Sequence, residues 1–91
     1  MTVYVDDAVH AWRDQRWAHL MADTLAELHA MAAQLGLPRR AFQNKASGAH
    51  YDVTTELRAQ AIALGAGAIS RHTDRAQVKA VIANARAQYQ P

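Results

Sequence analysis

The first apolar positions of the chain alternate with polar ones. In the sequence TVYVD, at residues 2–6, Val3 and Val5 are separated by more polar side chains. Successive side chains of a strand point to opposite faces, so this alternation predicts a strand with one buried face. The consecutive acids Asp6 and Asp7 mark its end.

The next stretch, residues 8–22, fits either a helix or a strand. Its Ala, Arg, Gln, Leu and Met residues are good helix formers. However, Thr24 and Glu27 form a capping box, in which the two side chains satisfy free backbone N–H groups at a helix start. A helix that begins there favours a strand over residues 16–22. The face of that strand would carry Trp17, His19 and Met21.

Three segments show the apolar spacing of a helix: residues 24–35, 55–64 and 73–89. Glycines follow the first two and provide stop signals. Between the helices, RRAFQ at residues 39–43 and AGAIS at residues 66–70 are short candidate strands. The intervening NKASGA is composed of turn-forming residues and predicts a loop that leads to His50.

Strands that alternate with helices in this way are typical of crossover units. We therefore expect one α/β domain over residues 1–91, because so short a chain leaves no surface for a second core. It should be a two-layer or three-layer sandwich of three helices on a mostly parallel sheet of three or four strands. The first strand could add to the sheet in the antiparallel direction.

Polar residues gather where this fold would bind a ligand. In parallel sheets ligands bind at the carboxyl ends of the strands. His50 is the leading candidate there, because the predicted helices do not use it in a stripe or as a cap, and an imidazole can act as acid or base. The expected catalytic residues are His50, Asp52 and Asp7, the metal ligands Asp6 and Asp7, and the ligand-binding residues Arg40, Gln43, Tyr51 and Arg71.

Each candidate also has a purely structural interpretation. Asp52 or Thr54 could cap the following helix, Tyr51 could pack, and Arg40 could be solvated. Two adjacent carboxylates suit Mg²⁺, the cofactor that this site would take. The histidines do not suggest a metal site. His19 fits a packed position beside Trp17, and no two histidines show metal-ligand spacing, so the sequence does not predict a zinc site.

Composition narrows the function classes. The chain is 51% hydrophobic and 20% charged, which is typical of a globular protein, and it has no Cys for a disulfide or thiolate site. The net charge of +2 comes from scattered residues, which favours nucleic acid as a partner only weakly. The N-terminus does not resemble a signal peptide and no apolar run is long enough for a membrane span. We expect a cytoplasmic protein.

Five motifs together resemble a family of small domains of unknown function from phages, prophages and bacteria. They are MTVYVDD, HLMADTLAELHAMAAQLGL, RRAFQ, HYDVT and LRAQAIALGA, in this order, and they span about the first three quarters of the chain. The resemblance implies a phage or bacterial origin and no particular activity.

Two classes of function fit these observations. The first is a domain, an enzyme or a binding protein, that acts on a phosphate-bearing ligand such as a nucleotide or nucleic acid. The second is a non-enzymatic accessory module that binds a host or phage protein, as a homodimer, through a surface that includes Trp12, Trp17 and the last helix. The alanine-rich core of so small a chain also favours self-association.

Overall fold

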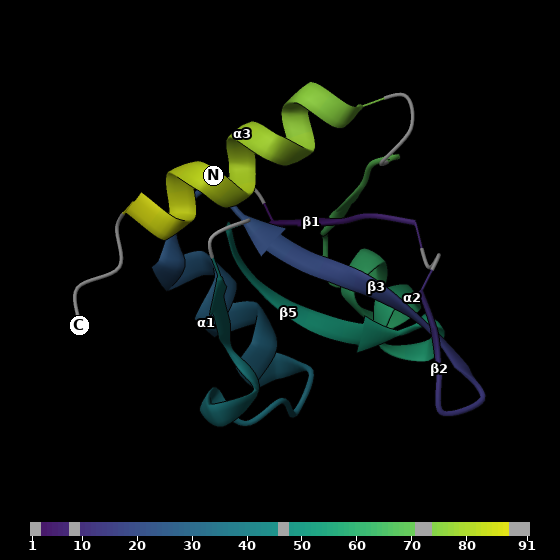
Figure 1. The fold of residues 1–91 in the computed structure, drawn as a ribbon. Helices are drawn as coiled ribbons and strands as arrows, with labels where there is room; N and C mark the ends of the chain where they lie inside the picture. Colours follow the sequence, from purple (N-terminus) through teal and green to yellow (C-terminus); the bar gives the residue numbers. More distant parts are fainter. Residues whose placement is uncertain (1–2, 8–9, 46–47, 71–73, 88–91) are drawn as a thin grey trace.

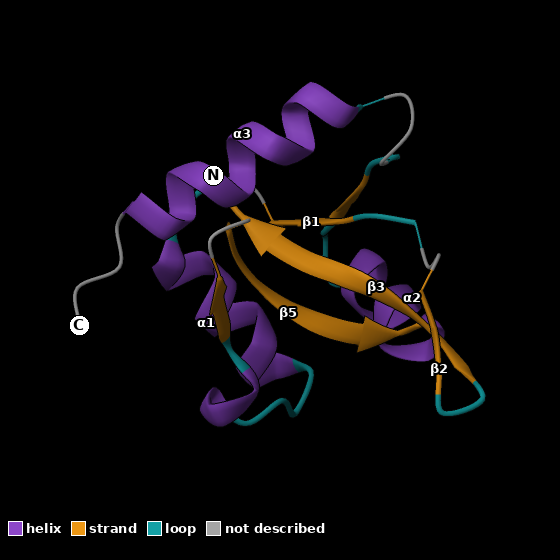
Figure 2. Ribbon diagram, in the orientation of Figure 1, coloured by secondary structure: helices purple, strands orange, loops and turns teal. Residues whose placement is uncertain are grey.

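The computed structural model describes residues 3–7, 10–45, 48–70 and 74–87, and shows a sheet with helices on both faces (Figures 1 and 2). The strands are β1 (Val3–Val5), β2 (His10–Trp12), β3 (Gln15–Ala22), β4 (Gln43–Lys45), β5 (Gly48–Thr54) and β6 (Gly67–Ala68). The helices are α1 (Leu25–Gln34), α2 (Thr55–Ala63) and α3 (Arg75–Ala87), with a 3-10 helix at Arg39–Ala41. The protein is therefore a small α/β domain, as the sequence predicts.

The sheet is mostly antiparallel, so the prediction of a mostly parallel sheet was wrong. The strand order is β4-β5-β3-β1-β6, with β2 paired to β3 beside this path. Strands β1, β2 and β5 pair with β3 in the antiparallel direction, and so does β4 with β5. Only β1 and β6 pair in parallel among the described strands.

Two reversals of the chain explain this difference. The turn between β2 and β3 consists of Arg13 and Asp14, whose φ angles of 49° and 62° are those of a two-residue hairpin turn. A second reversal joins β4 to β5. The helices do connect strands of equal direction, because β3 runs like β4 and β5 runs like β6. However, an antiparallel strand lies between the members of each pair: β5 between β3 and β4, and β3 between β5 and β6.

The strand predicted from RRAFQ was also wrong, since residues 39–41 form the 3-10 helix. The predicted NKASGA loop instead contributes residues to β4 and to the start of β5, with residues 46–47 outside the described part. Consequently His50 lies inside β5 and not in a loop before a helix. The strand expected over residues 16–22 is confirmed and is part of β3.

Both internal helix starts are capped by threonine. Thr24 Oγ1 accepts a hydrogen bond from the Glu27 backbone N–H at 3.2 Å and donates one to Glu27 Oε1 at 2.8 Å. Thr54 Oγ1 accepts one from the Leu57 N–H at 3.2 Å, so it is Thr54 and not Asp52 that caps α2. Asp52 is therefore left for another role.

Apolar side chains bury the two faces of the sheet unequally. One face packs against α1 and α2, in a core that includes Leu20, Tyr51 and Val53. The opposite face is covered by α3 (Figure 1). A smaller cluster of Met21, Val78 and Val81 lies between them. We call the second surface the α3 face. No helix among the described residues has the length and apolar character needed to cross a membrane.

Candidate functional site

Polar side chains form a row across the α3 face of the sheet. His19 in β3 lies directly opposite Asp52 in β5. On its other side, the pairing of β1 with β3 continues one residue beyond Val5, because the Asp6 N–H donates to the His19 carbonyl oxygen at 3.2 Å. His50 is two residues before Asp52 in the same strand, so it shares this face.

Asp6 fixes the position of His19. Its carboxylate is completely buried and accepts two hydrogen bonds from this one residue: Oδ1 from the His19 backbone N–H at 2.6 Å, and Oδ2 from the ring at Nδ1, at 2.8 Å. A carboxylate can only accept, so Nδ1 must carry the proton. In the neutral imidazole the lone pair is then on Nε2.

Three ligand atoms converge beside Asp52. The distance to Asp52 Oδ1 is 3.8 Å from His19 Nε2 and 3.6 Å from His50 Nε2. The two imidazole rings meet edge to face, with centroids 4.8 Å apart. One ligand atom from each of His19, His50 and Asp52 lies within 4.8 Å of the others. We call these three residues the His-His-Asp cluster.

The separations within this cluster suit a bridging cation better than direct hydrogen bonds. Hydrogen bonds between nitrogen and oxygen are about 2.7–3.2 Å long. Ligand atoms that each lie about 2.0–2.2 Å from one metal ion are roughly 2.9–3.5 Å apart. The observed distances of 3.6 and 3.8 Å are therefore within a small side-chain adjustment of a coordinated geometry.

Solvent reaches the cluster from the side of Asp52. The exposed fraction of the side chain is 40% for Asp52, 18% for His19 and 8% for His50. Gln43, opposite His50 on β4, donates a short hydrogen bond from Nε2 to Asp52 Oδ2, which leaves Oδ1 for the two imidazoles. The cluster therefore opens to solvent beside Asp52, whereas His50 is largely covered.

Of the residues predicted from the sequence, the structure brings together His50, Asp52 and Gln43. Asp6 does not contact these three directly but binds His19, which lies beside them. Asp6 and Asp7 do not bind side by side, because Asp7 Oδ2 accepts a hydrogen bond from Ser70 Oγ at 3.0 Å. Arg40 is exposed in the 3-10 helix. Arg71 lies outside the described residues.

Tyr51 points to the opposite face from its neighbours His50 and Asp52. It is almost completely buried, and its hydroxyl forms a hydrogen bond of 2.7 Å with Nδ1 of His29 in α1. Burial raises the pKa of Tyr51, and burial, followed by the nearby Arg39 charge, lowers the pKa of His29. Phe42 packs against both rings. Tyr51 therefore belongs to an aromatic cluster behind the site.

Sequence reasoning missed His19 as a candidate site residue, because its partners are distant in the sequence. Asp6 is 13 positions away and Asp52 is 33 positions away. It also did not predict the contact that Arg58 makes. Nε of Arg58 donates a hydrogen bond of 2.7 Å to the backbone carbonyl of Asp6, which places this α2 residue beside the end of β1. The alternation in RWAHLMA was the available signal for His19.

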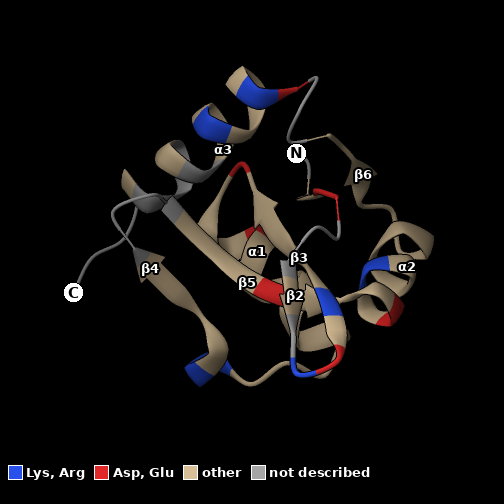
Figure 3. Cartoon of the chain, turned by 45° about the vertical axis from the view of Figure 1, so that its right-hand side comes forward, with Lys and Arg blue, Asp and Glu red and all other residues tan. Residues whose placement is uncertain are grey.

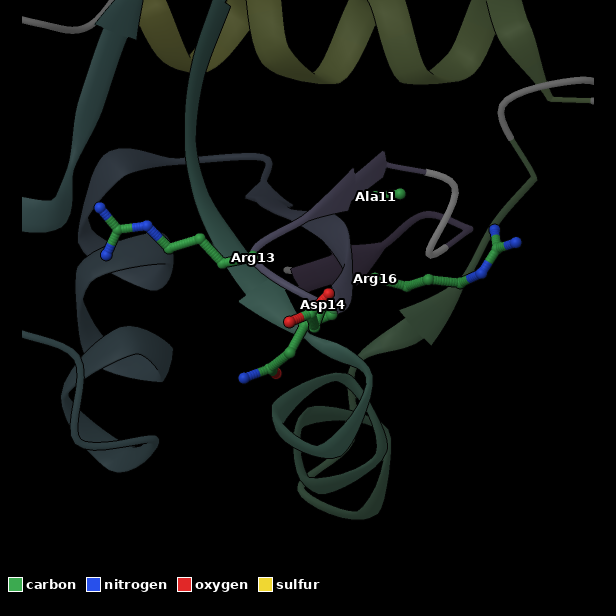
Figure 4. A pocket seen from close by; sticks show the side chains of 5 residues that line it. Ala11, Arg13, Asp14 and Arg16 are labelled. Atoms are coloured by element: carbon green, nitrogen blue, oxygen red, sulfur yellow. The ribbon is translucent and has the colours of Figure 1, made fainter.

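Two other surface features of the described residues are a hollow at one turn and the distribution of basic residues. The hollow at the β2–β3 turn is lined by Arg13, Asp14 and Arg16 among others, and Figure 4 shows the two arginines pointing away from each other. Lys and Arg positions are spread along the chain in Figure 3, over α2, α3 and the β2–β3 turn among other places. The side chain of Trp12 is outside the described part of the structure.

Comparisons with known proteins identify a family without an activity. A family model described as "Protein of unknown function (DUF4031)" matches residues 3–81. No curated protein and no solved structure matches the chain.

Proposed function

The chain belongs to the DUF4031 family of unknown function, and we propose that it is a divalent transition-metal-binding domain. The convergence of His19 Nε2, His50 Nε2 and Asp52 Oδ1 beside a buried carboxylate is the observation that supports this proposal. Metal-bound histidines commonly donate their second ring N–H to a carboxylate, which fixes the tautomer and makes the imidazole a better ligand. The pair Asp6 and His19 has this arrangement.

The donor set favours particular metals. Two imidazole nitrogens and one carboxylate oxygen suit Zn²⁺, Fe²⁺, Co²⁺ or Ni²⁺, whereas Mg²⁺ prefers oxygen ligands throughout. We therefore propose one of these softer ions for the site in place of the Mg²⁺ expected from the sequence. Three protein ligands on one side would leave further coordination positions open to solvent, as in catalytic metal sites.

An open coordination position on the metal indicates which class of ligand the domain would bind. A divalent ion attracts anionic oxygen atoms and can polarise a bound phosphoryl oxygen. We therefore retain the phosphate-bearing ligand, a nucleotide or nucleic acid, as the ligand of this metal. His50, first considered as an acid or base, becomes a metal ligand in this proposal, and Asp52 takes the same role.

Metal titration of single-site variants tests the proposal. Isothermal titration with Zn²⁺ and Co²⁺ should give one bound ion per chain, and binding should weaken at acid pH because protons compete for the imidazole nitrogens. The substitutions His50→Ala and Asp52→Asn each remove one ligand and should weaken binding by at least the roughly 10- to 100-fold that loss of an outer partner of a ligand costs.

His29→Ala is the matched control, because it removes a histidine that lies on the opposite face of the sheet. It should retain metal affinity close to that of the original chain. If the original chain binds no transition metal, or if His29→Ala lowers affinity as much as His50→Ala does, the proposal is wrong.

A homodimeric interaction module remains a second proposal. Ile62 and Leu64, at the end of α2, are the large apolar side chains found exposed among the described residues, with 38% and 50% of their surfaces accessible. They would contribute apolar area to a contact. Light scattering decides this directly, since a monomer at all concentrations would exclude the homodimer.

A further inference from the structure

The two oxygen atoms of the Asp52 carboxylate have different partners. Oδ1 lies 3.8 Å from His19 Nε2 and 3.6 Å from His50 Nε2, so it is the oxygen at which the two imidazoles converge. Oδ2 accepts a short hydrogen bond from Gln43 Nε2. The carboxylate therefore presents one oxygen to the His-His-Asp cluster and the other to a glutamine.

The pairing of β4 with β5 places Gln43 on the same face of the sheet as the cluster. Gln43 lies directly opposite His50, and Asp52 follows His50 by two residues along β5. Paired residues of neighbouring strands project to the same face, and a long side chain also reaches the diagonal neighbour. The contact between Gln43 and Asp52 therefore follows from the register of the two strands.

Gln43 donates this hydrogen bond without adding a charge. A carboxylate can only accept, so the amide must present its N–H₂ group. Lys or Arg in the same place would offset the negative charge with which Asp52 attracts a cation. Among the described residues, Asp52 lies within ion-pair distance of the two imidazoles and of no Lys or Arg. Its charge therefore stays available to a metal ion while the direction of its carboxylate is fixed.

The fixed direction of Asp52 matters because a carboxylate can bind a metal ion through one oxygen or through both. Three protein donors leave one position open on a four-coordinate ion, and a second oxygen from Asp52 would fill it. We propose that Gln43 is a positioning residue that holds Asp52 as a ligand through Oδ1 alone, and so keeps a coordination position open for one oxygen of a phosphate group. This inference rests on the proposed metal site and adds the residue that controls access of its ligand.

The test uses the full chain, saturated with Co²⁺ and titrated with inorganic phosphate. Saturation removes differences in metal affinity, so the titration measures the open coordination position alone. In the absence of phosphate that position would hold water, whose pKa a divalent ion lowers to about 7. The visible spectrum of Co²⁺ in the original chain should therefore change with pH near neutrality, and should change again when phosphate replaces the water.

Gln43→Met removes the donor and keeps a side chain of similar length. Oδ2 of Asp52 would then bind the metal in place of water, and phosphate would have to displace it. Phosphate binding should weaken by about 10- to 100-fold, the effect of one hydrogen bond to a charged group. The pH-dependent change of the cobalt spectrum should disappear, which a loss of folding stability alone would not produce.

Gln43→Lys keeps a donor to Asp52 but adds a positive charge. Because the ammonium group still holds Oδ2, phosphate affinity at saturating Co²⁺ should not fall. The affinity for Co²⁺ itself should fall, since the added charge repels the metal ion. The two substitutions should therefore have opposite effects: Gln43→Met impairs phosphate binding, and Gln43→Lys impairs metal binding.

Gln60→Met is the matched control. Gln60 is an exposed glutamine of α2, the helix that packs on the opposite face of the sheet. Its substitution should leave the metal affinity, the phosphate affinity and the pH profile of the cobalt spectrum unchanged.

The possible failures are distinguishable. If the original chain does not bind Co²⁺, the metal site itself is wrong and the role of Gln43 is overturned with it. If Co²⁺ binds but phosphate does not, only the inference about Gln43 is overturned. The same holds if Gln43→Met keeps the phosphate affinity and pH profile of the original chain, or if Gln60→Met loses as much.

Discussion

The structure changes the interpretation of His19 more than that of any other candidate residue. From the sequence it fits a packed side chain beside Trp17, while His50 and Asp52 are the predicted site. The register of three strands places His19 between Asp6 and Asp52. Residue type and local pattern predicted the members of the site that lie in one motif, and could not predict a partner that only strand pairing brings near.

Asp6→Asn tests whether the buried carboxylate controls this histidine. An amide can present its N–H₂ group to Nδ1, which would move the ring proton to Nε2 and block the metal ligand. We expect metal affinity to fall by about 10- to 100-fold, as for other partners of metal-bound histidines. Nitrogen-15 NMR of the imidazole should show the change of tautomer, which a loss of stability alone would not produce.

Asp7→Asn is the neighbouring control. The Asp7 carboxylate accepts a hydrogen bond from Ser70 and not from His19, so its loss should leave metal affinity and the His19 tautomer unchanged. Unchanged affinity in Asp6→Asn would contradict the role assigned to Asp6.

At the scale of elements, β5 serves two different environments. His50 and Asp52 belong to the His-His-Asp cluster on the α3 face, while Tyr51 between them faces α1 and forms a hydrogen bond with His29. One strand therefore joins the site to the main core. The motif HYDVT combines both functions, which explains why the sequence favoured a single site and included Tyr51 in it.

The contact between α1 and β5 predicts a pH dependence of stability. Burial lowers the pKa of His29 in the folded protein below its unfolded value of 6.5. The unfolded chain therefore takes up a proton more readily as the pH falls below about 6.5. This contribution to the free energy of unfolding is complete above that pH and is lost on acidification.

Urea unfolding at pH 7.5 and 5.5 measures this effect. His29→Gln should show a smaller loss of stability between the two pH values than the original chain. Tyr51→Phe should keep the original pH difference, because burial and not the hydroxyl is the first cause of the lowered pKa. An equal loss in His29→Gln and the original chain would show that other groups are responsible.

Local sequence patterns predicted the individual helices and strands better than the way the strands pair. The helices, their threonine caps and the strands β1 and β3 were predictable, because each depends on neighbouring residues. The β2–β3 hairpin was missed because Arg13 and Asp14 occupy a turn that usually contains Asn and Gly. Without that reversal, alternating strands and helices predict a parallel sheet.

At the scale of the whole molecule, α3 covers only part of its face of the sheet. Its Val78 and Val81 cover Met21, and Asp52 on the same face remains 40% exposed. The His-His-Asp cluster draws on β3 and β5, the two longest strands. A bound metal should therefore stabilise the fold as well as the site, by about 2.7 kcal/mol at a metal concentration 100 times Kd.

The most direct measurement of the central claim is a crystal structure of the Zn²⁺-soaked protein with anomalous diffraction at the zinc edge. The account predicts one anomalous peak about 2.0–2.2 Å from His19 Nε2, His50 Nε2 and an oxygen of Asp52. The Asp6 carboxylate should remain bonded to His19 Nδ1. No peak at this position, with His19 Nε2 hydrogen-bonded directly to Asp52, would contradict the claim.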